Sequence, residues 1–321
     1  MKSFLRLIRI QNLIIIAFTQ YMVRWCLVYP ILIAQNSKFS LQLSEVRFFL
    51  LVLSTVMIAA AGYIINDYFD NRIDKVNKPE RLLIDKGVKR RVAMVAHLVI
   101  SFIAILIGFF VSYSIGVPKL VFIHFICVIG LWFYSTNFKK QFLTGNLLIS
   151  LFTALVPFVV VVYELVLCYK VYLPFDETLS FKAIWIYIAG ISFFTFLITM
   201  IHEIIKDMER VEGDKEYGYN TLPIVIGIKS SKLIAITIAL VTLFFLSYYQ
   251  VLQWQKNDML TFYYFVVGLQ IPLLWLIHKI ITANTKNAFR FAGNITKMIM
   301  LMGICYLFVF AYILLDFIHS I

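Results

Sequence analysis

Acidic and amide side chains recur at helical spacing in the segment from Asn66 to Asp74. Asn66, Asp70 and Asp74 are four residues apart, so on a helix they share one face, with Asp67 beside them. Like charges at this spacing repel each other, and the repulsion costs more where water is scarce. A cation between the carboxylates would remove that cost. Carboxylates and an amide without His or Cys favour a hard cation such as Mg²⁺, which shares its coordination with substrate phosphates.

A second acidic segment occurs later in the chain. Glu203, Asp207 and Asp214 share a helical face if the helix continues that far, and Gly213 leaves open that it ends earlier. Two facing carboxylate sets holding Mg²⁺ would grip a diphosphate from both ends. The simpler alternative is that each acid is a solvated helix end, paired with a nearby base such as Lys206.

The elements that carry these segments are predicted to be membrane helices. The chain has 321 residues, of which 62% are hydrophobic and only 14% charged, which is too little polar surface for a soluble globule. Apolar runs long enough to cross a bilayer give about nine spans. They are 12–34, 46–66, 92–112, 117–135, 145–168, 182–205, 230–252, 258–281 and 295–318.

Most of the 29 lysines and arginines fall in alternate connections between these spans. The positive-inside rule therefore predicts a cytoplasmic N-terminus, cytoplasmic acidic segments and an outside C-terminus, in the cell inner membrane. Although the net charge is +12, the bases do not form a patch interleaved with exposed aromatic residues. We therefore expect the lipid bilayer as a partner and no nucleic acid.

Motifs spread in order through most of the chain resemble those of UbiA-type membrane prenyltransferases. These motifs are most similar to those of the branch that alkylates geranylgeranylglyceryl phosphate. The motifs are Asn66-x-x-x-Asp70-x-x-x-Asp74, Asn77-Lys78-Pro79-Glu80-Arg81, Tyr134-Ser135, Lys139-Lys140, Gly145-Asn146, Glu212-Gly213-Asp214 and Thr221-Leu222-Pro223.

This resemblance implies an all-α polytopic membrane protein, with about nine transmembrane helices around a central cavity and a cytoplasmic cap. Residues 1–321 would form a single domain. The implied activity is Mg²⁺-dependent transfer of a polyprenyl group from its diphosphate to a lipophilic acceptor, with geranylgeranylglyceryl phosphate favoured.

The site residues implied by the resemblance fall into three groups. The metal ligands would be Asn66, Asp70, Asp74, Asp207 and Asp214. The substrate-binding residues would be Asn66, Lys78, Arg81, Tyr134, Lys206 and Arg210. Lys139 would join the four aspartates in catalysis, since bases near Mg²⁺ can neutralise a departing diphosphate. An aromatic face such as that of Tyr134 can stabilise a prenyl cation, although ordinary packing would also explain this residue.

Three departures from the family pattern stand out. Arg210 occupies the first position of the second motif, Asp-x-x-x-Asp, which ends at Asp214. Asp207 or Glu203 would then serve as a ligand instead, and Arg210 would contact the diphosphate directly. The chain also has Arg81-Leu82 where Arg-Pro is usual, and one extra residue between Tyr134 and Lys139.

The sequence suggests four alternative functions and argues against two of them. An aromatic prenyltransferase of quinone biosynthesis would use 4-hydroxybenzoate or dihydroxynaphthoate as the acceptor. A CDP-alcohol phosphotransferase also uses clustered aspartates, but its Asp-Gly and Ala-Arg signature is missing between Asp67 and Asp85. A transporter would place its ionisable groups near mid-span in broken helices rather than at helix ends. A non-catalytic binding protein is the fourth alternative, and Arg210 is its main support.

Overall fold

A computed structural model describes residues 2–77, 83–85, 87–175, 180–255 and 257–319. Within these ranges the chain is helical apart from turns, short connections and one isolated β-bridge between Ile84 and Val88. The α-helices are α1 (Lys2–Leu7), α2 (Ile10–Val23), α3 (Tyr29–Gln35), α4 (Glu45–Asn77), α5 (Arg90–Ser114), α6 (Val121–Thr136), α7 (Thr144–Tyr172), α8 (Lys182–Glu216), α9 (Leu222–Val225), α10 (Gly227–Gln255), α11 (Met259–Tyr264), α12 (Ile271–Thr282) and α13 (Lys286–His319).

Nine helical segments of the described chain are long and apolar enough to cross a membrane. The first joins α2 to α3 through the π-helical turn η1 (Arg24–Val28), and the eighth joins α11 to α12 through η5 (Phe265–Gln270). A helix satisfies its own backbone polar groups, which is what the bilayer interior requires. The predicted all-α class and the predicted number of spans are confirmed.

Two of these helices continue well beyond the predicted ends of their spans. The span predicted at 46–66 belongs to α4, which runs to Asn77, and the span predicted at 182–205 belongs to α8, which runs to Glu216. Both acidic segments are therefore the last turns of membrane helices. Their side chains are fixed by helix geometry, because no flexible loop intervenes.

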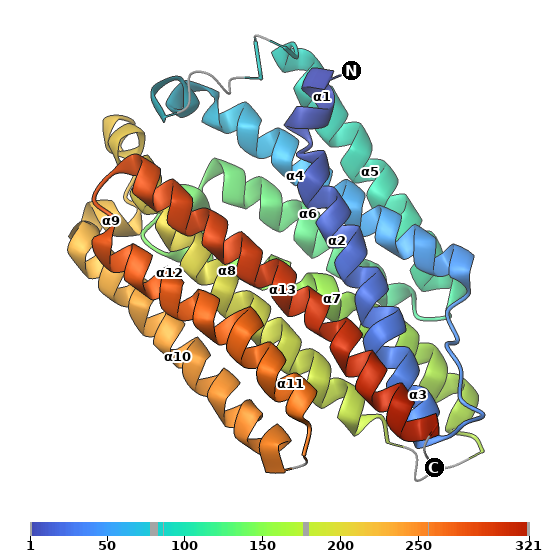
Figure 1. Cartoon of the computed structure of the whole chain (residues 1–321). Coiled ribbons are helices and arrows are strands. Elements are labelled where there is room, and N and C mark those ends of the chain that lie inside the picture. Colours follow the sequence, from blue (N-terminus) through green and yellow to red (C-terminus); the bar gives the residue numbers. More distant parts are fainter. Residues whose placement is uncertain (1, 78–82, 86, 176–179, 256, 320–321) are drawn as a thin grey trace.

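The helices form a bundle in which α13 packs against the first membrane span, made of α2, η1 and α3 (Figure 1). α4 packs along α5 and α6, whereas α8 packs along α7, α10 and α13. α13 also contacts α2 and α3, and α4 contacts α8. The start of α1 and the end of α13 lie at opposite ends of the bundle (Figure 1), as an odd number of crossings requires.

The outward faces of the helices carry large apolar side chains. Phe102 on α5 and Phe244 on α10 are 63% and 67% exposed. Small residues on the same helices, such as Ala104 and Ala239, are fully buried against neighbouring helices. Soluble proteins rarely expose so much continuous apolar surface, and lipid chains would cover it. The chain is an integral membrane protein.

Candidate active site

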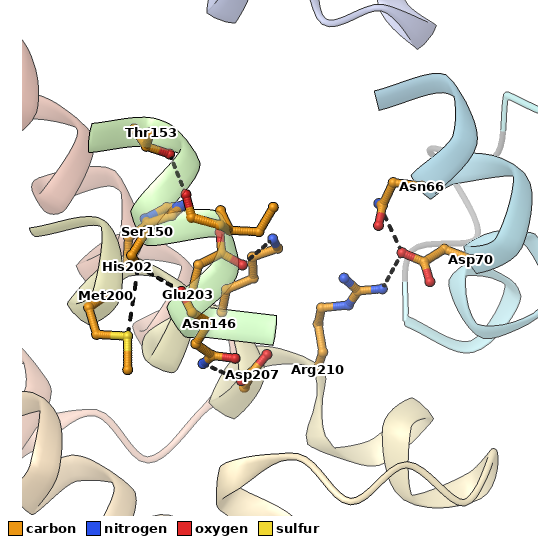
Figure 2. Close-up of polar contacts among 12 residues, drawn as sticks. Asn66, Asp70, Asn146, Ser150, Thr153, Met200, His202, Glu203, Asp207 and Arg210 are labelled. Atoms are coloured by element: carbon orange, nitrogen blue, oxygen red, sulfur yellow. Dashed lines mark hydrogen bonds and ion pairs between the residues drawn. The ribbon is translucent and has the colours of Figure 1, made fainter. Parts of the chain in front are cut away.

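The first acidic segment lies on the final turns of α4, where its members share one face as predicted. The Asn66 amide donates from Nδ2 to Asp70 Oδ2 at 3.0 Å (Figure 2). Asp70 is buried, while the Asp74 side chain is 25% exposed. Asn66 Oδ1 is also buried and has no hydrogen-bond partner. An oxygen in that position is available to a cation.

The second acidic segment lies on α8, which continues through Gly213 without interruption. Gly213 does not end the helix, and its role is instead to contact Asn77 at the end of α4. A Cβ on Gly213 would lie 2.5 Å from Asn77 Nδ2, and the Gly213 N–H donates to Asn77 Oδ1 at 3.3 Å. The glycine therefore permits a close approach between the ends of α4 and α8, which brings the two acidic segments together.

Arg210 extends from α8 to Asp70 on α4 (Figure 2). Its Nη2 lies 3.3 Å from Asp70 Oδ2 and 3.4 Å from Asp74 Oδ1. Its charge also interacts with that of Asp214 on its own helix. The guanidinium thus links acids of both segments. Its Nε is buried and has no hydrogen-bond partner.

Lys139 is the second cation on Asp70. It lies in the short 3₁₀ turn η4 (Phe138–Lys140), and its Nζ is 2.6 Å from Asp70 Oδ1. A Cβ on Gly145, at the start of α7, would lie 2.8 Å from the Lys139 Cα, so only glycine permits this backbone approach. Burial lowers the pKa of Lys139 below its ordinary value, and the charge of Asp70 opposes this shift.

These side chains line one small polar pocket between α4, α6, α7 and α8. Its lining residues are Asp70, Tyr134, Lys139, Asn146, Lys206, Asp207, Arg210, Asp214 and Tyr219. Lys206 also pairs with Glu203, Nζ to Oε2 at 2.7 Å. Burial, together with the charges of Asp70 and Asp214, raises the pKa of Tyr219. Tyr219 therefore stays a neutral phenol that can donate a hydrogen bond.

Most of the predicted site residues meet at this pocket. Asn66 and Asp74 join it through Asp70 and Arg210, while Lys78 and Arg81 lie outside the described residues. The prediction omitted Asn146 and Tyr219 as site residues. Asn146 Nδ2 donates to Asp207 Oδ2 at 2.8 Å. The motif Gly145-Asn146 was a signal for the first omission, whereas Tyr219 belongs to no motif that the prediction used.

The two halves of the site differ in how well they suit a divalent cation. Asn66, Asp70 and Asp74 offer hard oxygen donors, including the unpartnered Asn66 Oδ1, and they fit Mg²⁺. No group of three or more His, Cys, Asp or Glu side chains with metal-binding geometry occurs in the described part of the chain. The second half has Arg210 among its acids, and it does not form a comparable donor set.

Known proteins are similar to this chain in sequence and in fold. A digeranylgeranylglyceryl phosphate synthase from Methanosphaera stadtmanae is 29% identical over 57% of this chain, and one from Methanothermobacter thermautotrophicus is 35% identical over 60% of it. The matched segments cover 58% and 62% of those two proteins, which is less than two thirds of their length.

Solved structures confirm the fold over nearly the whole chain. One described as digeranylgeranylglyceryl phosphate synthase in membranes aligns with a TM-score of 0.61 at 23% identity, covering 97% of this chain and 98% of that one. A UbiA homologue from Archaeoglobus fulgidus, bound to GPP and Mg²⁺, aligns with a TM-score of 0.54 at 14% identity, covering 96% and 99%. The family model described as the UbiA prenyltransferase family matches residues 23–301, and the chain belongs to this family.

Proposed function

We propose that this chain transfers a polyprenyl group from an allylic diphosphate to a lipophilic acceptor, in an Mg²⁺-dependent reaction. The observation that carries the proposal is the meeting of Asp70, Asp207 and Asp214 with the cations Lys139 and Arg210 in one buried pocket. Carboxylates that hold a metal and cations that face it form a receptor for diphosphate. We also infer that residues 1–321 act as one domain.

The residues that would hold Mg²⁺ are Asn66, Asp70 and Asp74, which share one face of α4. When bound, the ion would shield the diphosphate charge and make it a better leaving group. Lys139, Lys206 and Arg210 line the pocket from two other elements and would hold the diphosphate oxygens. Their charges counter the negative charge that grows on the diphosphate as it departs.

Prenyl transfer breaks the bond between the allylic carbon and the diphosphate oxygen, and the electron pair leaves with the diphosphate. The positive charge left on the prenyl group would face Tyr134, whose ring lines the same pocket. The acceptor hydroxyl then forms the new carbon–oxygen bond, and its proton passes to the departed diphosphate held in the same pocket. The buried setting of Asp70 and Asp214 excludes water that would otherwise hydrolyse the cation.

The acceptor that we favour is geranylgeranylglyceryl phosphate. Two relatives named digeranylgeranylglyceryl phosphate synthase support this choice. Geranylgeranylglyceryl phosphate also carries a phosphate, and the cations Lys139, Lys206 and Arg210 that line the pocket suit a phosphorylated acceptor as well as the diphosphate. The alternative is an aromatic acceptor of quinone biosynthesis, which the experiment below separates from the first.

We further propose that the pocket faces the cytoplasm and that the loops after the second and sixth spans cap it. The support is the distribution of lysine and arginine, which favours a cytoplasmic N-terminus and an outside C-terminus in the inner membrane. Labelling of single cysteines placed near each terminus, with a reagent that does not cross membranes, tests this orientation.

The deciding experiment uses the full chain in lipid nanodiscs with labelled geranylgeranyl diphosphate. The acceptor panel contains geranylgeranylglyceryl phosphate, 4-hydroxybenzoate and 1,4-dihydroxy-2-naphthoate, each with Mg²⁺ or with EDTA. We expect product with the glyceryl phosphate in Mg²⁺ only, and loss of that product in the Asp70→Ala and Asp74→Ala variants. Product only with an aromatic acceptor would overturn the acceptor choice, and full activity of both variants would overturn the catalytic assignment.

A further inference from the structure

Arg210 lies where a cation is needed to hold the two acidic segments together. Its guanidinium reaches Asp70 and Asp74 on α4 at 3.3 and 3.4 Å and interacts with Asp214 on α8. Three carboxylates from two helices thus interact with this guanidinium, and Lys139 is a second cation on Asp70. Without the guanidinium, the repulsion among these acids would be larger in a setting that is poor in water.

The same contacts place Arg210 in competition with a metal ion. Asp70 and Asp74 are the carboxylates that best suit Mg²⁺, and Arg210 Nη2 already contacts an oxygen of each. On α8, by contrast, Asp207 accepts a hydrogen bond from Asn146, and the positive charge of Arg210 acts electrostatically on Asp214. The α8 acids therefore have protein partners rather than a donor set of their own.

The guanidinium also has donors left for a ligand. Arg210 lines the pocket, its side chain is 13% exposed, and its buried Nε has no hydrogen-bond partner. A guanidinium carries five N–H donors in a rigid plane that matches two oxygens of a phosphate at once. The same side chain can therefore hold the carboxylates together and contact a phosphate in the pocket.

We propose that Arg210 is the resident cation of the α8 half of the site, taking the place of a second divalent ion and binding the diphosphate directly. The chain then binds one divalent cation, at Asn66, Asp70 and Asp74, and not two. This inference rests on the proposed function, because it assumes a diphosphate ligand. It concerns how that ligand is held and not which acceptor is used.

Metal stoichiometry gives the first test. Mn²⁺, which is visible by electron paramagnetic resonance, is titrated into the full purified chain with geranylgeranyl S-thiolodiphosphate, an analogue that does not ionise readily. We expect one tightly bound Mn²⁺ per chain in the wild type and two in Arg210→Asp, which adds a carboxylate where the guanidinium was. Two tightly bound ions in the wild type would overturn the proposal.

The second test uses two affinities that should change in opposite directions. In Arg210→Gln, the affinity for Mn²⁺ alone should rise, because the competitor at Asp70 and Asp74 is gone. The affinity for the thiolodiphosphate in Mg²⁺ should fall about 10- to 100-fold, because a charge-assisted contact is lost. General damage to the site would lower both affinities and would overturn the proposal, as would an unchanged thiolodiphosphate affinity.

Two further variants separate the effect of losing the positive charge at position 210 from the effect of general structural damage. Arg210→Lys keeps a cation, so both affinities should lie between those of the wild type and Arg210→Gln. Arg290→Gln is the matched control, since Arg290 pairs with Glu209 on α8 at 3.0 Å but does not line the pocket. It should leave both affinities unchanged. If the wild type binds one Mn²⁺ and the analogue but transfers no prenyl group, the proposed function fails while this inference stands.

Discussion

Replacement of Glu164 by leucine should destabilise the bundle by about 3–5 kcal/mol, because it removes one partner of a buried ion pair. Glu164 on α7 and Arg24 in η1 are 0% and 1% exposed, and Arg24 Nε lies 3.2 Å from Glu164 Oε2. Glu164 Oε1 also accepts the backbone N–H groups of Gln42 and Leu43 at 2.5 and 2.8 Å. One carboxylate thus joins two helices and the connection that precedes α4.

The contacts that remain decide where in that range the loss falls. Glu164→Leu leaves the two backbone N–H groups without an acceptor, at about 1–3 kcal/mol each. Arg24 still reaches Glu45 at 3.1 Å, but the Glu45 side chain is 65% exposed and compensates only partly. Glu164→Gln keeps an oxygen acceptor and should lose only about 1–2 kcal/mol. The double variant Arg24→Met/Glu164→Leu removes both charges of this buried pair, so it should be more stable than Glu164→Leu, which leaves Arg24 without its buried partner.

Thermal unfolding in detergent micelles can measure these losses through a thiol-reactive fluorophore. Cys168 is fully buried on the same helix as Glu164, so it reacts only when the helix separates from its neighbours. The other cysteines are first replaced by alanine. The melting temperature of Glu164→Leu should fall by roughly 4–8 °C. An unchanged melting temperature, or a melting temperature of the double variant as low as that of Glu164→Leu, would show that the buried ion pair does not set the stability of this region.

Three further predictions concern the site. Asp70→Asn should lower kcat/KM for prenyl transfer at least about 100-fold, because it weakens a metal ligand and the partner of Lys139 at 2.6 Å; steady-state assays with labelled product check this. Gly145→Ala should lower kcat about 10-fold or more, since its Cβ would lie 2.8 Å from the Lys139 Cα, whereas Gly190→Ala on α8 meets nothing within 4 Å and should keep full activity. Removal of Mg²⁺ with EDTA should abolish transfer and should lower the melting temperature of the wild type and of Glu164→Leu by the same amount, because Asp70 lies near the end of α4 and the Arg24–Glu164 pair near its start.

Periodicity and composition predicted the elements of this fold well, because both are local properties of the chain. The spacing of Asn66, Asp70 and Asp74 places them on one face of any helix, and that face is what the structure shows. The ends of the spans were harder to predict from the sequence. The prediction ended the second and sixth spans where apolar residues stop, yet α4 continues to Asn77 and α8 to Glu216. Contacts between those ends support turns that hydropathy alone does not predict.

Contacts between side chains on different helices could not be predicted from the sequence, because spacing along one helix does not determine how that helix is rotated relative to another. Arg210 and Asp70 are on different helices, as are Asn146 and Asp207, and only packing brings each pair together. Gly213 illustrates the same limit. Its residue type is consistent with either a helix end or a close helix contact, and only the position of Asn77 decides between them.

The site therefore depends on one side chain whose residue type conflicts with its motif. A carboxylate at position 210 would have added to the negative charge of Asp70, Asp74 and Asp214, and a bound metal would then have been needed to offset much of the repulsion among these acids. The guanidinium reverses the sign of that position and lies 3.3 Å from Asp70. It follows that the two acidic segments can stay together before any ligand arrives. Dependence on the metal should then be confined to the reaction, and chelation should stop transfer while leaving the α4–α8 contact intact.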